Sequence, residues 1–148
     1  MFTSLMYVSK SCLARSAQTR ELNDIVKRSR ARNEQLQVRG ALVFTEDHFA
    51  QVLEGPKAGV DALMDSICRD LRHEQVTVTG EARSDDYRFP NWTLAYYGGA
   101  SYMDQQVAAL LRERDADYGD DAAKLYFLIR SFAIESLDSG PIGRPSPR

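Results

Sequence analysis

The sequence has few cysteines, no long hydrophobic run and little net charge, and each shortage excludes a class of protein. Its two cysteines, Cys12 and Cys68, are too few for a disulfide scaffold, and neither stands in a Cys-x-x-Cys or Cys/His spacing that would bind zinc. No run approaches the ~18 consecutive apolar residues of a membrane span, and the first residues lack the basic start and long apolar core of a signal peptide. We therefore expect no metal site, no membrane association and a cytoplasmic location.

The charges are nearly balanced, because 19 basic and 21 acidic side chains leave a formal net charge of -2. A protein whose main ligand is nucleic acid or an anionic membrane usually carries a basic surplus, which is missing here. One basic run, residues 27–32, is interpreted as a solvated helix face, since Glu21, Asp24 and Glu34 flank it. Nucleic-acid binding is therefore not expected. A chain of 148 residues fits one globular domain, which needs no disulfide or metal to stabilise its core.

Hydrophobic periodicity predicts alternating strands and helices over the first 97 residues. Apolar residues at every second position predict strands at 2–9, 41–45, 48–54, 76–79 and 92–97. Helical spacing covers residues 17–36 and a second segment that opens at Pro56 and ends near residues 70–73. The order βαββαββ favours an α+β, ferredoxin-like fold, with a five-stranded mixed sheet and both helices on one face.

The remaining residues predict two more helices and a tail. The helices are expected at about 102–113 and 120–136. An apolar stripe of Leu125, Leu128, Ile129 and Phe132 requires a partner surface, and the open face of the sheet is the obvious one. Residues 137–148 hold three prolines and two glycines, so we expect a disordered tail.

Four uncharged polar side chains fall on otherwise apolar faces: Tyr7, Ser29, Asn33 and Gln51. In the predicted fold, the sheet face with Tyr7 and Gln51 looks towards the helix positions of the other two. A buried polar group without a partner costs about 1–3 kcal/mol, so something must satisfy these four. Either they satisfy one another, or they surround a flat heteroaromatic ligand between the helices, and periodicity alone leaves both interpretations open.

Several separated motifs resemble the BLUF family, the blue-light sensors that use a flavin. The signature is carried by residues 33–44, Asn-Glu-Gln-Leu-Gln-Val-Arg-Gly-Ala-Leu-Val-Phe, and by residues 49–56, Phe-Ala-Gln-Val-Leu-Glu-Gly-Pro. The first strand with Tyr7, residues 69–73 (Arg-Asp-Leu-Arg-His) and residues 88–92 (Arg-Phe-Pro-Asn-Trp) also match. The chain is thus identified as a BLUF protein of the short, single-domain type. Its photosensory domain would cover residues 1–97, followed by a helical extension at 98–136 and the tail at 137–148.

The resemblance implies a non-covalent flavin, FAD with FMN as the alternative, whose ring lies between the two helices. It makes Tyr7 the photochemical donor of an electron and a proton, and Gln51 the amide that rearranges its hydrogen bonds. Trp92 and Leu94 of the last strand complete the implied photoactive set. Asn33 would bind the polar edge of the ring. The implied cofactor-binding residues are Tyr7, Ile25, Ser29, Arg32, Asn33, Phe49, Gln51, Asp70, Arg72 and His73, the last three around the ribityl and phosphate side.

This sequence departs from the family pattern at a few positions. Arg39 stands before Gly40, where a small hydroxyl residue is common, and Leu94 stands where methionine is frequent. Ser66 replaces a basic residue of some members, and Arg32 stands where others carry asparagine or histidine. The change at Leu94 affects how movement of Gln51 would be passed to the last strand, and it does not affect the light reaction itself.

The resulting hypothesis is a blue-light photoreceptor that is not itself an enzyme. Rearranged hydrogen bonds of Gln51 would alter the last strand and the C-terminal helices, and so signal through a downstream protein partner or a change of homo-oligomeric assembly. One alternative is a light-independent interaction module on the same fold, against which the presence of both Tyr7 and Gln51 argues. The other, an acylphosphatase-like hydrolase, would need an anion-binding loop with arginine and asparagine after the first strand, and the sequence has none.

Overall fold

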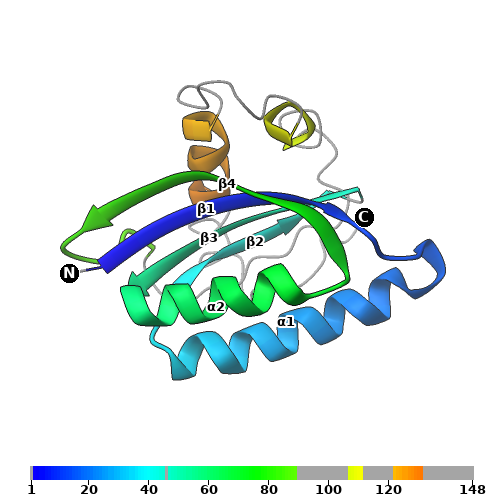
Figure 1. Ribbon diagram of the computed structural model, residues 1–148, viewed down its shortest axis with the longest axis horizontal. Helices are drawn as coiled ribbons and strands as arrows, with labels where there is room; N and C mark the ends of the chain where they lie inside the picture. The colour runs from blue at the N-terminus through cyan, green and yellow to red at the C-terminus, as the bar shows by residue number, and fades with distance from the viewer. Residues whose placement is uncertain (1, 46, 90–106, 112–121, 132–148) are drawn as a thin grey trace.

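The computed structural model describes residues 2–45, 47–89, 107–111 and 122–131. A sheet lies in the middle, two helices cover one of its faces, and the helical segments at 107–111 and 122–131 cover the other (Figure 1). The elements in chain order are β1 (Phe2–Ser11), a short 3₁₀ turn at Arg15–Ala17, α1 (Gln18–Gln35), β2 (Arg39–Phe44), β3 (His48–Pro56), α2 (Lys57–Arg69) and β4 (His73–Ser84).

The four described strands form one antiparallel sheet in the order β2-β3-β1-β4. This order, with α1 and α2 on the same face, confirms the predicted ferredoxin-like α+β fold. The predicted fifth strand at 92–97, which would have made the sheet mixed, lies outside the described residues, and so does the predicted tail. No helix within the described ranges has both the length and the apolar composition needed to cross a membrane.

Two boundaries differ from the periodicity. β4 runs from His73 to Ser84, whereas the alternation indicated only residues 76–79. Most side chains of β4 are exposed, so its ends carry no apolar alternation, and pairing with β1 alone defines them. α2 ends at Arg69, and His73 therefore begins a strand rather than ending a helix.

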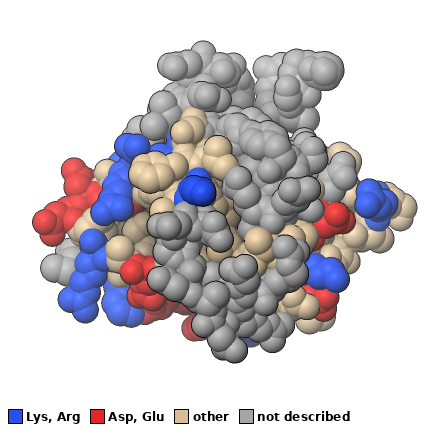
Figure 2. All heavy atoms as spheres, turned by 90° about the horizontal axis from the view of Figure 1, so that it is seen from above, with Lys and Arg blue, Asp and Glu red and all other residues tan. Residues whose placement is uncertain are grey.

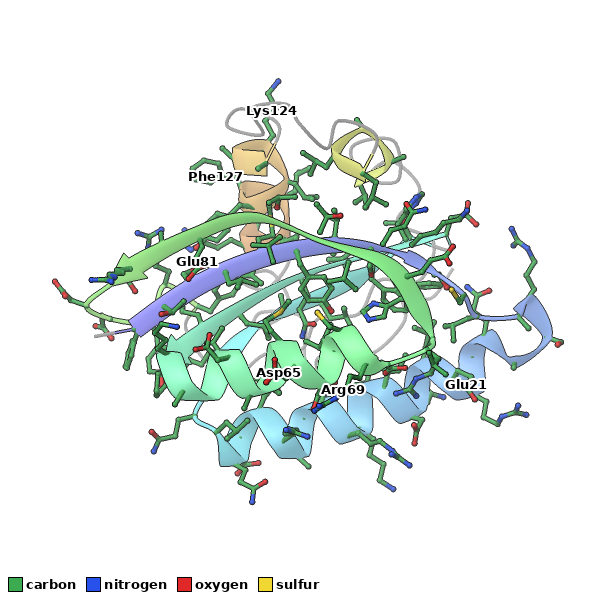
Figure 3. The ribbon with its side chains drawn as sticks, viewed as in Figure 1. Glu21, Asp65, Arg69, Glu81, Lys124 and Phe127 are labelled. Atoms are coloured by element: carbon green, nitrogen blue, oxygen red, sulfur yellow. The ribbon has the colours of Figure 1, made fainter. Side chains whose placement is uncertain are left out.

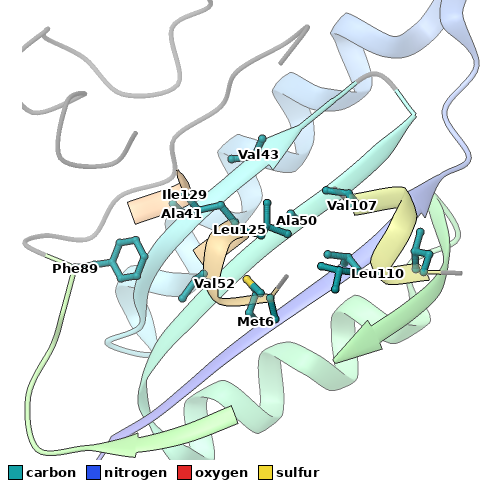
Figure 4. Close-up of a cluster of buried hydrophobic side chains, with 13 residues drawn as sticks. Met6, Ala41, Val43, Ala50, Val52, Phe89, Val107, Leu110, Leu125 and Ile129 are labelled. Carbon is teal, nitrogen blue, oxygen red and sulfur yellow. The ribbon is translucent and has the colours of Figure 1, made fainter. Parts of the chain in front are cut away.

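The face of the sheet opposite α1 and α2 carries a large buried hydrophobic cluster (Figure 4). Strand residues such as Met6 and Val52 pack there against Leu110, Leu125 and Ile129 of the C-terminal helical segments. The predicted packing of these segments on the open face is confirmed. We call this set of residues the back cluster, and its members are Met6, Val8, Ala41, Val43, Ala50, Val52, Phe89, Val107, Leu110, Leu111, Ala122, Leu125 and Ile129.

Candidate functional site

A pocket of about 80 Å³ lies between α1, α2 and the sheet. Its lining comes from all six main elements and from the loop that joins α2 to β4. The lining residues are Tyr7, Ile25, Arg28, Ser29, Leu42, Phe49, Gln51, Ile67, Asp70, Arg72 and His73. We call this site the helix-face pocket.

Tyr7 and Gln51 meet at the floor of the helix-face pocket. They are direct partners across the β1–β3 pair, so their side chains leave the sheet on the same face. Both are buried, at 3% and 5% exposure, and the Tyr7 hydroxyl donates a hydrogen bond to Oε1 of Gln51 at 2.6 Å. Burial raises the pKa of the Tyr7 hydroxyl well above its ordinary value, and the Asp70 carboxyl and the Cys68 thiol add to this rise. Tyr7 is therefore a neutral donor at physiological pH.

His73 forms part of the wall and is held on both ring nitrogens. Its Nε2 lies 2.6 Å from the carbonyl oxygen of Ile67, and its Nδ1 lies 2.8 Å from the hydroxyl of Ser9. Because a carbonyl oxygen only accepts, Nε2 carries the hydrogen, and on a neutral ring Nδ1 accepts from Ser9. The ring stands edge-on to Tyr7 and to Phe49, with centroid distances of 6.1 and 5.9 Å.

Arg72 connects the α2–β4 loop to α1 at the edge of the pocket. Its Nε and Nη2 donate to the two oxygens of Asp70 at 3.0 and 2.7 Å, and its Nη1 donates to Asp24 of α1 at 3.0 Å. Glu21, also on α1, lies 3.8 Å from Nη1. The hydrogen bonds from Arg72 lower the pKa of both Asp70 and Asp24. One guanidinium thus faces three carboxylates here.

Eight of the binding residues implied by the resemblance line the helix-face pocket, and two do not. Arg32 is exposed and lines a surface hollow with Ala31 and Leu36. Asn33 is buried, but it lies beside Gln37 and Arg39 rather than in the pocket. Trp92 and Leu94 lie outside the described residues.

Sequence reasoning missed three lining residues, Arg28, Leu42 and Ile67. Leu42 pairs directly with Gln51 across β2 and β3, so the alternation that placed Gln51 on the helix face could have placed Leu42 there too. Ile67 belongs to the apolar stripe of α2, which gave a second usable signal. Arg28 carried no such signal, since it read as one charge among several on a solvated face.

The chemistry of the lining fits a flavin. Apolar side chains of Ile25, Leu42, Phe49 and Ile67 suit the faces of a flat ring, while the Gln51 amide and the Ser29 hydroxyl suit its polar edge. At about 80 Å³ the pocket is narrower than a fused three-ring system, so side chains of α1 and α2 must move apart to admit one.

A larger hollow, about 660 Å³, lies on the opposite face between β4 and the helical segment 122–131. Glu81 of β4 and Phe127 of this segment both line it, and Phe127 lies above the sheet in Figure 3. Seen from above, charged side chains of both signs are interspersed around the rim of this face (Figure 2). Of the residues implied by the resemblance, none that the structure describes lines this hollow.

Comparison with known proteins identifies the family. Residues 2–95 match BLUF, described as sensors of blue-light using FAD. The chain is 34% identical over 76 residues to the blue light- and temperature-regulated antirepressor BluF of Escherichia coli, covering 51% of this chain and 18% of the antirepressor. It is 34% identical over 93 residues to the photoactivated adenylate cyclase subunit beta of Euglena gracilis, covering 62% of this chain and 11% of the cyclase subunit. The chain therefore spans less than a fifth of the length of these two relatives.

Solved structures agree with this result over almost the whole chain. The dark state of BlrB, a BLUF protein, superposes with a TM-score of 0.70 at 28% identity, covering 88% of this chain and 96% of BlrB. The ground state of BlsA gives a TM-score of 0.72 at 20% identity, which supports the fold alone. The chain belongs to the BLUF family of blue-light sensors, which use FAD.

Proposed function

We propose that this protein is a blue-light photoreceptor that binds FAD non-covalently in the helix-face pocket and signals to a downstream protein. The observation that carries the proposal is the buried hydrogen bond from Tyr7 to Gln51 within a pocket whose walls suit a flat ring. A tyrosine and an amide could satisfy one another for structural reasons alone. Family membership, together with the apolar walls beside this pair, favours a photochemical role.

The flavin, when bound, absorbs blue light and in its excited state is a strong oxidant. Tyr7 would supply an electron and its phenolic proton towards the excited flavin, and both would return to Tyr7 afterwards, so that neither group ends oxidised or reduced. That proton already faces Oε1 of Gln51, so it moves along an existing 2.6 Å contact. The Gln51 amide has an acceptor and two donors, and it can therefore settle in a second orientation or tautomer that offers different groups to its neighbours.

Other residues of the helix-face pocket orient the ligand and exclude water. Ile25, Phe49 and Ile67 would enclose the ring, and Ser29 would offer a hydroxyl to its polar edge. Arg72 would lie on the phosphate side, as the resemblance implies, but Asp70 and Asp24 already hold its guanidinium. The phosphates must compete with these carboxylates, so the ring is expected to contribute more of the affinity than the phosphates do.

The output of the sensor is proposed from its relatives. An antirepressor regulated by blue light and photoactivated cyclases are both named for a light-controlled activity. By analogy, this chain acts as a sensor rather than as an enzyme and controls a partner protein or its own homo-oligomeric state. The implied route through Trp92 and Leu94 stays a prediction.

The decisive experiment is an absorption spectrum of the FAD-loaded protein before and after blue light. We expect a reversible red shift of the flavin bands, and we expect Tyr7→Phe to abolish it because the proton donor is lost. Tyr87→Phe is the matched control, since that hydroxyl bonds to the carbonyl of Gln37 and lies outside the helix-face pocket.

Two outcomes would contradict the proposal. One is a yellow protein whose spectrum does not respond to illumination. The other is an unchanged light response in Tyr7→Phe, which would favour the light-independent interaction module instead.

A further inference from the structure

Glu54 is a carboxylate buried in the sheet on the side away from the helix-face pocket. It lies on β3 three residues after Gln51, and this odd spacing places the two side chains on opposite faces. It is fully buried, at 0% exposure, and pairs across the sheet with Ser4 and Arg39. Because burying a charge without partners is costly, Glu54 must have compensating contacts.

Those contacts are made to the chain that follows β4. Oε1 of Glu54 accepts hydrogen bonds from the backbone N–H groups of Arg88 and Phe89, at 2.6 and 3.0 Å. Among the described residues, Oε2 has no hydrogen-bond partner. The buried carboxylate is therefore committed to holding residues 88–89, and we call this arrangement the Glu54 clamp.

The same two residues are held from the other side by the helical segment 122–131. Nε of Arg130 donates to the carbonyl oxygen of Arg88 at 3.2 Å. The ring of Phe89 is fully buried and meets the ring of Tyr126 edge to face, at a centroid distance of 6.0 Å. Burial raises the pKa of the Tyr126 hydroxyl, the Glu54 carboxylate adds to this rise, and Arg88 opposes it.

A continuous series of contacts thus leads from the pocket strand to the C-terminal helical segment. It runs along β3 from Gln51 to Glu54, through the clamp to residues 88–89, and then to Tyr126 and Arg130. Packed side chains and hydrogen bonds in a continuous series of this kind can carry energetic coupling between two sites. Hydrogen bonds weaken quickly as their distance and angle change. A small shift of β3 at Gln51 would therefore alter the two hydrogen bonds that Glu54 accepts from residues 88–89.

We infer that Glu54 is a positioning residue that couples β3, the strand of Gln51, to the helical segment 122–131 through its clamp on residues 88–89. The inference rests on the proposed photoreceptor function and supplies a route that does not need Trp92 or Leu94. In this role Glu54 has no contact with the flavin. Its substitution should leave the red shift intact while uncoupling the helical segment from it.

The first test uses a matched pair of variants on segment 122–131, measured as FAD-loaded full chains in the dark and under blue light. Arg130→Met removes the hydrogen bond to Arg88. Lys124→Met removes the same charge from an exposed side chain that points away from the sheet (Figure 3). We expect the light-minus-dark difference in deuterium uptake over 122–131 to fall about threefold or more in Arg130→Met, the effect of losing one hydrogen bond, and to stay unchanged in Lys124→Met.

The second test examines the clamp itself. Glu54→Leu removes the acceptor, whereas Glu54→Gln keeps one, so Glu54→Gln should preserve the uptake difference and Glu54→Leu should lose it. Both variants should keep the full red shift. A purely structural role would lower stability in Glu54→Leu without separating the spectral response from the uptake response. If Glu54→Leu does not fold, the Arg130→Met arm decides the question.

The possible outcomes test the coupling role of Glu54 separately from the proposed photoreceptor function. A wild-type protein without a red shift contradicts the photoreceptor proposal. A wild-type red shift with no uptake difference over 122–131, or an uptake difference that survives in Arg130→Met, overturns the inference alone. Loss of the red shift in both Glu54 variants would also overturn it, because Glu54 would then act on the pocket.

Discussion

Tyr7 keeps its proton in the folded chain at a pH where an exposed tyrosine has lost it, because burial raises the pKa of its hydroxyl. This shift links folding to pH. In the unfolded chain the hydroxyl titrates near pH 10, its ordinary value, whereas in the folded chain it stays protonated. Above that pH the unfolded state releases a proton that the folded state retains, so stability falls as pH rises.

We therefore predict a difference between the wild type and Tyr7→Phe at alkaline pH. In the flavin-free chain, the free energy of unfolding should fall more steeply with pH in the wild type than in Tyr7→Phe. The two slopes should differ by about 1.4 kcal/mol for each pH unit above ~10. The other tyrosines are common to both proteins and cancel in the comparison. Urea denaturation at intervals from neutral to strongly alkaline pH measures the two slopes, and parallel slopes would show that Tyr7 ionises normally.

At the scale of elements, two glycines of the sheet meet opposite surroundings. Gly40 of β2 has a φ of +151°, and a Cβ added there would overlap the carbonyl oxygen of Val52 on β3. Gly80 of β4 has nothing within 4 Å of the corresponding position. The close approach at Gly40 brings the β2 backbone against β3, the strand that carries Gln51.

Gly40→Ala should therefore destabilise the protein strongly, by roughly 3 kcal/mol or more, since both the backbone angle and the space are unsuitable. Gly80→Ala is the matched control and should change the free energy of unfolding by less than about 0.5 kcal/mol. Urea denaturation of both variants measures the difference. Equal effects would mean that the sheet relaxes around the added methyl group.

The elements also explain what the sequence could and could not predict. The strands of Tyr7 and Gln51 both show a clear period-two pattern in the sequence. That pattern was enough to predict that the two side chains share a face of the sheet. β4 has mostly exposed side chains and left no such pattern beyond its middle, which is why its ends were missed. The Glu54 clamp joins residues 34 and 35 positions apart, and no local rule connects them. Arg32 came from family resemblance alone, whereas Asn33 was also placed on the pocket side by helical periodicity, and the structure places both outside the pocket.

At the scale of the whole molecule, the helix-face pocket joins α1, α2 and the sheet, so a ligand there stabilises all three together. FAD at about a hundred times its dissociation constant should add ~2.7 kcal/mol to the free energy of unfolding. For a domain of this size, that gain raises Tm by roughly 5–10 °C.

The matched variants are Ser29→Trp, which fills the pocket, and Ser16→Trp, which adds the same side chain at an exposed position. Thermal denaturation with and without FAD should show the increase in the wild type and in Ser16→Trp, and little of it in Ser29→Trp. An equal increase in both variants would place the ligand elsewhere.

Successive residues of β3 serve different halves of the molecule. Gln51 faces the pocket, while Val52 next to it belongs to the back cluster. Inserting or deleting one residue in this strand would exchange the two faces, turning Gln51 towards the back cluster and an apolar neighbour towards the pocket. The number of residues in β3 therefore fixes which side chains face the pocket and which face the back cluster. Insertions and deletions that preserve function must fall in the loops of the protein, whereas β3 can vary only by substitution.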